Sequence, residues 1–192
     1  MTTSEPLFTS RRERRLWFWA LAVVVAIYST LGLAGTLVSV LGDRTVGFGW
    51  FWGFIVLVAA IAWSGWTRRP GRFELWVGVG VTAAYAMAFF RLGLGPAERT
   101  HLFEYGLVAV LIHQALLERR SNGRPVPVPG IIAIGVTVLL GWVDESIQWL
   151  LPNRVYDIVD VGFNALAALM SVTASSALAR ARRWDYERRA AD

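Results

Sequence analysis

Residues 16–41 read LWFWALAVVVAIYSTLGLAGTLVSVL, a stretch without a single charged side chain. A helix needs about 20 mostly apolar residues to cross a bilayer, because its backbone must satisfy its own hydrogen bonds where water is absent. This stretch meets that length. It is also longer than the apolar core of a cleavable signal peptide, which spans about 7–15 residues. We therefore predict that it is an uncleaved membrane-spanning helix.

Five further apolar segments follow along the chain, and most of them are long enough to span a bilayer. They cover residues 45–67, 75–90, 102–117, 130–151 and 156–179. Segments 75–90 and 102–117 are the short ones, and the latter contains Glu104 and His113. The pattern predicts an all-α polytopic integral membrane protein, a bundle of about six transmembrane helices.

The overall composition agrees with this fold class. Of the 192 residues, 55% are hydrophobic and 17% are charged, whereas a soluble domain has about 25% charged residues. An ordinary soluble enzyme and a disordered chain are both excluded. The sequence contains no cysteine, which excludes disulfides, thiolate metal sites, cysteine nucleophiles and a lipoprotein anchor.

The basic residues indicate the topology. All 19 are arginines, and the net charge is +5. With six spans, 15 arginines fall in the two tails and the second and fourth loops, and 4 fall in the remaining loops. Since cytoplasmic loops carry the excess of basic residues, we predict cytoplasmic termini in a multi-pass protein of the plasma membrane. Anionic lipids account for these arginines, so we expect no nucleic-acid partner.

Ionisable residues inside spans are costly and are therefore functional candidates. Here they gather at three helix ends, which the topology places together near the outer leaflet. The candidate polar cluster consists of His101, Glu104, Tyr105, Asp144, Glu145, Gln148, Arg154, Asp157, Asp160 and Asn164. Spacings of three and seven residues place several members of each helix on one face. We expect the crowded carboxylates to keep a proton or to recruit a cation.

Each of these residues also has a purely structural interpretation. Asp157 and Asp160 are placed to cap the start of a helix, where acids favour the positive end of the dipole. Arg154 is placed to pair with them in the tight turn. A histidine at a helix start is often interfacial, and amide side chains often bond neighbouring helices. The concentration of polar groups at one depth favours a functional role.

The second half of the chain resembles the VanZ-like family of bacterial membrane proteins. The resemblance rests on residues 144–148 (DESIQ), 152–154 (PNR), Asp157, Asp160 and Asn164, together with HLFEYG at 101–106. Asn153 stands where the family often has glycine. Ala167 and Ser171 replace two further glycines but remain small, so close helix packing is preserved.

The resemblance covers about residues 99–175, and it sets the domain organisation that we predict. Residues 1–98 form an N-terminal three-helix membrane region without a recognised signature, and residues 99–179 form the VanZ-like three-helix region. Residues 180–192 form a basic cytoplasmic tail. The founding member of the family is associated with low-level resistance to teicoplanin.

Two classes of function are favoured for the polar cluster, and a third, a proton- or ion-coupled transporter, ranks below them because the acids lie at one depth only. The first is a cell-envelope protein whose outward-facing polar pocket binds a lipid, a cell-wall precursor or a glycopeptide, and so affects susceptibility to teicoplanin-type glycopeptides. The alternative is an intramembrane hydrolase or transferase that acts on an envelope lipid through His/carboxylate acid–base or metal chemistry. No H-E-x-x-H motif is present, and we predict no cofactor and no resident metal. We expect membrane lipids or a cell-wall precursor as partners, with a membrane-protein partner also open.

Overall fold

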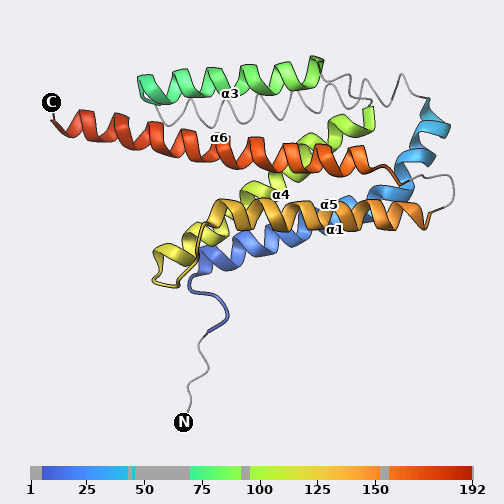
Figure 1. Cartoon of the computed structure of the whole chain (residues 1–192), viewed down its shortest axis with the longest axis horizontal. Coiled ribbons are helices and arrows are strands. Elements are labelled where there is room, and N and C mark those ends of the chain that lie inside the picture. Colours follow the sequence, from blue (N-terminus) through green and yellow to red (C-terminus); the bar gives the residue numbers. More distant parts are fainter. Residues whose placement is uncertain (1–5, 43–44, 46–69, 92–95, 152–155, 192) are drawn as a thin grey trace, which may run out of the picture. The chain divides into compact units, whose positions relative to one another are not determined.

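Helices are the only regular secondary structure in the part of the chain that the computed structural model describes, residues 6–42, 45, 70–91, 96–151 and 156–191. Five long helices lie within these residues, and Figure 1 labels them in chain order. They are α1 (Arg11–Leu41), α3 (Arg72–Arg91), α4 (Pro96–Ser121), α5 (Pro129–Trp149) and α6 (Ile158–Ala191). The predicted fold class, all-α, is confirmed at this level.

Five of the six predicted apolar segments coincide with these helices. The remaining segment, 45–67, lies outside the described residues apart from Thr45. Three stretches of the described chain are long and apolar enough to cross a membrane, by length and composition: Arg11–Leu31 of α1, the whole of α5, and α6. The protein therefore carries the helices expected of a membrane protein.

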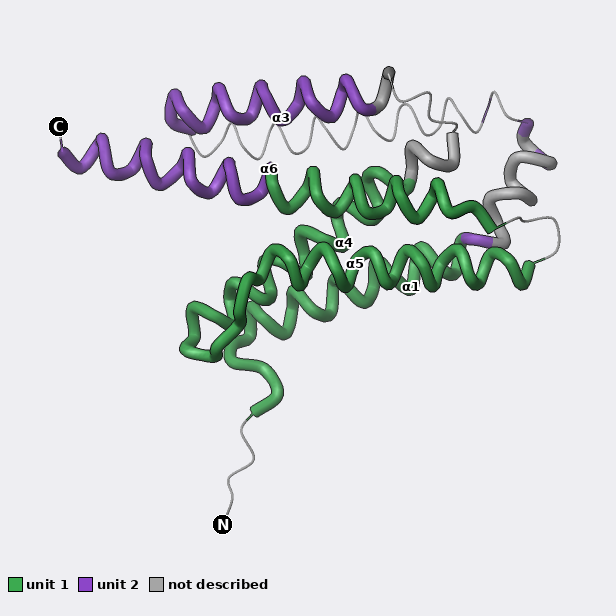
Figure 2. The backbone as a smooth tube through the Cα atoms, viewed as in Figure 1, with its two compact units in different colours: residues 1–30, 97–173 green, residues 31–96, 174–192 purple. Residues whose placement is uncertain are grey.

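The chain divides into two compact units, coloured separately in Figure 2. Unit 1 comprises Met1–Thr30 and Ala97–Thr173, and unit 2 comprises Leu31–Pro96 and Ala174–Asp192. Unit 1 thus contains most of α1, α4, α5 and the first half of α6. Unit 2 contains α3 and the second half of α6.

Helix α4 is the central helix of unit 1. Tyr105, Val108, Ala109, Ile112 and Ala115 are each at most 2% exposed along it. A helix that is surrounded by protein does not need a lipid-compatible exterior all round. This explains why the predicted segment 102–117, which contains Glu104 and His113, is nevertheless part of a long, well-packed helix.

Small residues let α4 and α6 approach each other closely. A Cβ atom on Gly106 of α4 would lie 2.5 Å from the Ser171 hydroxyl oxygen of α6. Ala167 and Ser171 are 0% and 6% exposed. The small residues at these two positions of α6 therefore do what the sequence predicted of them, which is to permit close packing.

One end of unit 1 is held by a network between the start of α1 and the end of α4. The backbone N–H of Glu13 donates to the Ser10 hydroxyl at 2.9 Å, which caps α1. The Glu13 carboxylate turns back to accept from the backbone N–H of Thr9 at 2.6 Å, as in a capping box. Its other oxygen lies 3.4 Å from the Arg119 guanidinium. Glu118 completes the network, 3.4 Å from Arg12.

In unit 2, the last turns of α6 pack against the start of α3. The Asp185 carboxylate accepts from the backbone N–H groups of Phe73 and Glu74, at 3.3 and 3.0 Å, and so caps α3 from another helix. Arg182 donates two hydrogen bonds to the Glu74 carboxylate. The predicted basic tail is thus a helical continuation of α6, because arginine favours helices and these side chains have partners on α3.

The Glu13–Arg119 pair gives a first testable prediction. Arg119→Ala leaves one oxygen of a carboxylate that is 0% exposed without its ionic partner, and this costs about 1–3 kcal/mol. We expect a lower midpoint of thermal unfolding in detergent micelles. Arg120→Ala is the matched control, since Arg120 is exposed and such surface substitutions change stability by about 0.5 kcal/mol or less. Equal stability of the two variants would contradict the interpretation.

Candidate functional site

The polar residues of α4, α5 and α6 meet inside unit 1, at the end opposite the Glu13–Arg119 network. Their buried members come from all three helices, with exposed fractions of at most 8%. We call this buried set the polar core: His101, Tyr105, Asp144, Glu145, Gln148 and Asn164. All six belong to the cluster predicted from the sequence.

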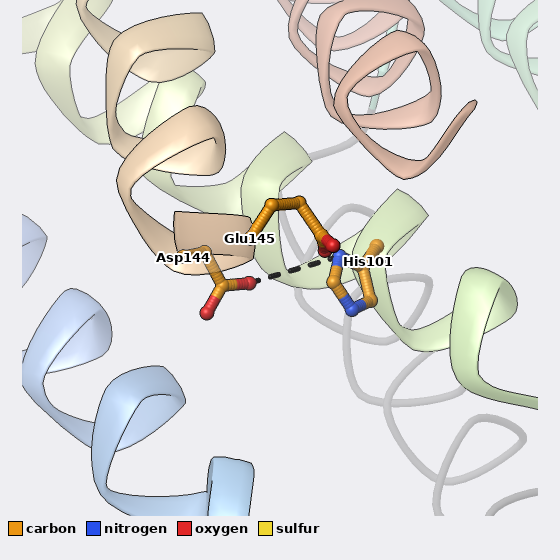
Figure 3. Close-up of side chains that lie close together, drawn as sticks. All are labelled: His101, Asp144 and Glu145. Atoms are coloured by element: carbon orange, nitrogen blue, oxygen red, sulfur yellow. Dashed lines mark ion pairs between the residues drawn. The ribbon is translucent and has the colours of Figure 1, made fainter. Parts of the chain in front are cut away.

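His101 lies at the centre of the polar core. Its Nδ1 atom is 3.0 Å from the Asn164 Oδ1 atom, which joins α4 to α6. The same nitrogen is 4.0 Å from Asp144 Oδ2, which joins α4 to α5. The Tyr105 ring stacks on the His101 ring with the two centroids 5.7 Å apart. Figure 3 shows the carboxylates of Asp144 and Glu145 turned toward the imidazole.

Glu145 is held from two directions. Gln148, one helical turn further along α5, donates from its Nε2 atom to Glu145 Oε1 at 2.9 Å. The backbone N–H of Asp157, just before α6, donates to Glu145 Oε2 at 3.3 Å. Both carboxylate oxygens are thus satisfied, so this buried acid has a fixed orientation.

The remaining acids of the predicted cluster lie at its margin. Glu104 is half-buried and interacts electrostatically with His101 and Asp144. Asp160, also half-buried, interacts in the same way with Glu145. Asp157 is exposed, and its carboxylate accepts from the backbone N–H of Val159 at 2.8 Å.

Asp157 therefore caps α6 with its side chain and reaches the polar core with its backbone. The sequence suggested two roles for Asp157, as a functional acid of the cluster or as a helix cap, and its side chain has the second role. Arg154, the remaining member of the predicted cluster, lies outside the described residues.

Two residues of this region were not predicted from the sequence. Tyr28 of α1 donates from its hydroxyl to the backbone oxygen of Leu140 at 2.8 Å, and it interacts electrostatically with Asp144. Gly141 of α5 makes room for Asn164, because a Cβ atom at this position would lie 2.6 Å from the Asn164 side-chain nitrogen. A tyrosine hydroxyl in the middle of the apolar segment 16–41 is the available signal for Tyr28. No local pattern distinguishes Gly141 from the other glycines of α5.

The Asn164 side-chain nitrogen has no hydrogen-bond acceptor among the described residues, and its side chain is 0% exposed. The Tyr105 hydroxyl, on a side chain that is also 0% exposed, faces the Asp144 carboxylate. A buried donor without an acceptor is costly, so such groups point to a partner that binds there.

Chemically, the polar core offers a mixed set of groups. Two carboxylates accept hydrogen bonds or bind cations, the imidazole accepts or donates a proton, and the Asn164 nitrogen offers a donor without an acceptor among the described residues. The set suits a ligand with hydroxyl, amine or amide groups, or a metal ion.

Comparisons with known proteins do not identify the chain. No protein-family model matches it, and searches of curated proteins and of solved structures find no match. The VanZ-like resemblance accordingly stays a prediction that rests on the quoted residues alone. The function has to be argued from the polar core itself.

The close approach of α5 and α6 at Gly141 gives the second prediction. Gly141→Ala places a Cβ atom within 2.6–3.0 Å of three Asn164 atoms, and such overpacking costs about 1–3 kcal/mol. We expect a clearly lower unfolding midpoint in detergent micelles. Gly135→Ala, on the same helix, is the control, because a Cβ atom there meets nothing within 4 Å. If both variants unfold at the same temperature as the unmodified protein, the packing of the Asn164 side chain does not require the absence of a Cβ atom at Gly141.

Proposed function

We propose that this chain is a multi-pass VanZ-like protein of the plasma membrane, with six spans and both termini in the cytoplasm. The directions of the unit 1 helices support this. The start of α1 lies beside the end of α4, where Arg12 meets Glu118, so the two helices are antiparallel. Antiparallel spans require an even number of crossings between them. The intervening apolar segments, 75–90 and 45–67, supply two.

The distribution of charge in unit 1 supports the orientation. Arg119 lies at one end of α4 and His101 at the other, about 27 Å apart at 1.5 Å per residue. That separation approaches the thickness of the hydrocarbon core, about 30 Å. The arginine-rich end belongs in the cytoplasm, which leaves the polar core near the outer leaflet.

In this orientation the polar core binds the polar part of an envelope lipid, a cell-wall precursor or a glycopeptide. The observation that carries the proposal is the buried Asn164 nitrogen, which has no acceptor among the described residues, beside the two carboxylates of α5. Sugars and peptides carry the hydroxyl, amide and amine groups that such a mixed set recognises. Through this binding, the protein alters susceptibility to glycopeptides of the teicoplanin type.

The second candidate is a hydrolase or transferase that acts on an envelope lipid. The 4.0 Å approach of His101 to Asp144 favours it, because a carboxylate that orients an imidazole supports general-base catalysis. Water is then the nucleophile in a hydrolase. Turnover of a labelled lipid precursor by the purified protein distinguishes this candidate from binding alone.

The third prediction concerns topology. The chain has no native cysteine, so single cysteines report their own positions. Pro127→Cys, in the exposed loop between α4 and α5, should react with a membrane-impermeant maleimide only after cells are permeabilised. Leu150→Cys, at the exposed outer end of α5, should react in cells whose plasma membrane is intact and whose outer envelope layers have been removed. The opposite pattern would overturn the outward-facing orientation.

The fourth prediction concerns function. In a strain that lacks the native gene, Glu145→Gln should fail to restore glycopeptide susceptibility and the lipid-precursor profile to the levels that the unmodified chain restores. This substitution removes the carboxylate of a fully buried acid that accepts two hydrogen bonds, and it keeps the shape of the side chain. Glu187→Gln, an exposed acid near the end of α6, is the control. Full complementation by Glu145→Gln contradicts the proposal, and reduced membrane levels of this variant alone assign Glu145 a structural role.

A further inference from the structure

We propose that His101, Asp144 and Glu145 form a binding site for one divalent transition-metal ion of the Zn²⁺ or Mn²⁺ type. Each of these residues offers one ligand atom, and the three atoms lie within 4.8 Å of one another. Figure 3 shows the three side chains converging from α4 and α5. The site belongs to the polar core, but its occupation by a metal does not require the envelope ligand of the proposed function.

The distances suit a metal after a small contraction. Metal–ligand bonds of about 2.0–2.2 Å place neighbouring ligand atoms of a tetrahedral ion roughly 3.3–3.6 Å apart. The observed approach of His101 Nδ1 to Asp144 Oδ2 is 4.0 Å. Contraction of the triad from separations of up to 4.8 Å requires small rotations of the His101 and Asp144 side chains toward Glu145, whose carboxylate is held by its two hydrogen bonds.

The surrounding groups give the second, independent indication. The Asn164 amide lies against the triad, with its oxygen 3.0 Å from His101 Nδ1, and its nitrogen has no acceptor among the described residues. The Tyr105 hydroxyl is also buried and faces the Asp144 carboxylate. Donors in these positions fit a metal-bound water or anion. When the ion binds His101 Nδ1, the neutral imidazole carries its proton on Nε2, and the Asn164 oxygen, which then no longer accepts from Nδ1, becomes available as a further oxygen ligand.

The donor set selects the class of ion. One imidazole and two carboxylates suit zinc and manganese, whereas copper(I) and iron–sulfur clusters need thiolate or thioether ligands. The chain has no cysteine to supply thiolates. Two carboxylates balance the charge of a divalent ion, and three protein ligands leave coordination positions open. An open position gives phosphate or carboxylate groups a place to bind among acids that would otherwise repel them.

The bonds around Glu145 also agree with a ligand role. Gln148 and the backbone of Asp157 fix the carboxylate from behind, in the manner of the outer hydrogen bonds that orient metal ligands. Asp157 and Asp160, the two acids that the predicted cluster draws from the start of α6, are not part of the triad.

The proposal is tested by metal content. The full chain, purified in detergent with a tag that lacks histidine, is dialysed against Zn²⁺ or Mn²⁺, passed through a metal-free column and analysed by elemental mass spectrometry. We expect about one ion per chain for at least one of the two metals. His101→Ala, Asp144→Asn and Glu145→Gln should each lower the content at least tenfold, since even outer-shell changes cost 10–100-fold in affinity.

Two matched variants serve as controls. His113→Ala removes the other buried histidine of α4, and Asp157→Asn removes an acid beside the polar core whose carboxylate caps α6. Both should retain the metal. A rise in the unfolding midpoint of the unmodified chain with Zn²⁺ or Mn²⁺ provides a measurement that does not depend on any variant folding.

Each outcome decides the question. A metal content below a tenth of an ion per chain with both metals, or equal retention by the triad and control variants, overturns the site. That result leaves hydrogen-bonded recognition of a headgroup intact. If metal binds as expected but Glu145→Gln complements the deletion strain fully, the site stands and the proposed envelope function fails.

Discussion

The contact between His101 and Asn164 is the interaction on which the arrangement of unit 1 depends. It joins the start of α4 to the start of α6 at a point where both side chains are buried. The Asn164 side chain fits there only because Gly141 of α5 has no Cβ atom. One polar contact therefore sets the spacing of three helices. It also brings the carboxylates of α5 against the imidazole. The same contact therefore determines both how the helices pack and which groups meet in the polar core.

Much of this arrangement follows from the sequence through two constraints. Bilayer-length uncharged runs specify helices, and the alternation of arginines specifies which helix ends lie together. These two constraints place the six residues of the polar core in one cluster without any knowledge of helix packing. The contacts within the cluster do not follow, because they depend on helix rotation and on the distance between axes. Tyr28 and Gly141 illustrate this, since each matters only through a neighbour on another helix.

Segment boundaries are the other part that the sequence left open. The apolar run of the last segment stops at residue 179, yet α6 continues to Ala191. Hydropathy detects where lipid contact ends, whereas a helix ends where its backbone bonds end. Arginine is a good helix former, and Asp185 finds the free N–H groups of α3. Asp157 is a similar case for a single residue. Its position in the sequence allows a place in the functional cluster, whereas its observed hydrogen bond makes it the cap of α6.

The two ends of unit 1 use charge in opposite ways. At the arginine-rich end, acids and bases are paired, as in Glu13 with Arg119 and Glu118 with Arg12, and the pairs tie α1 to α4. At the other end, Asp144 and Glu145 are adjacent, both 0% exposed, and directed at one imidazole. A fold needs the first arrangement to hold its helices together. The second concentrates acidic groups in a place where apolar residues would pack at lower cost, and this unfavourable arrangement is the physical ground for the binding role that we propose.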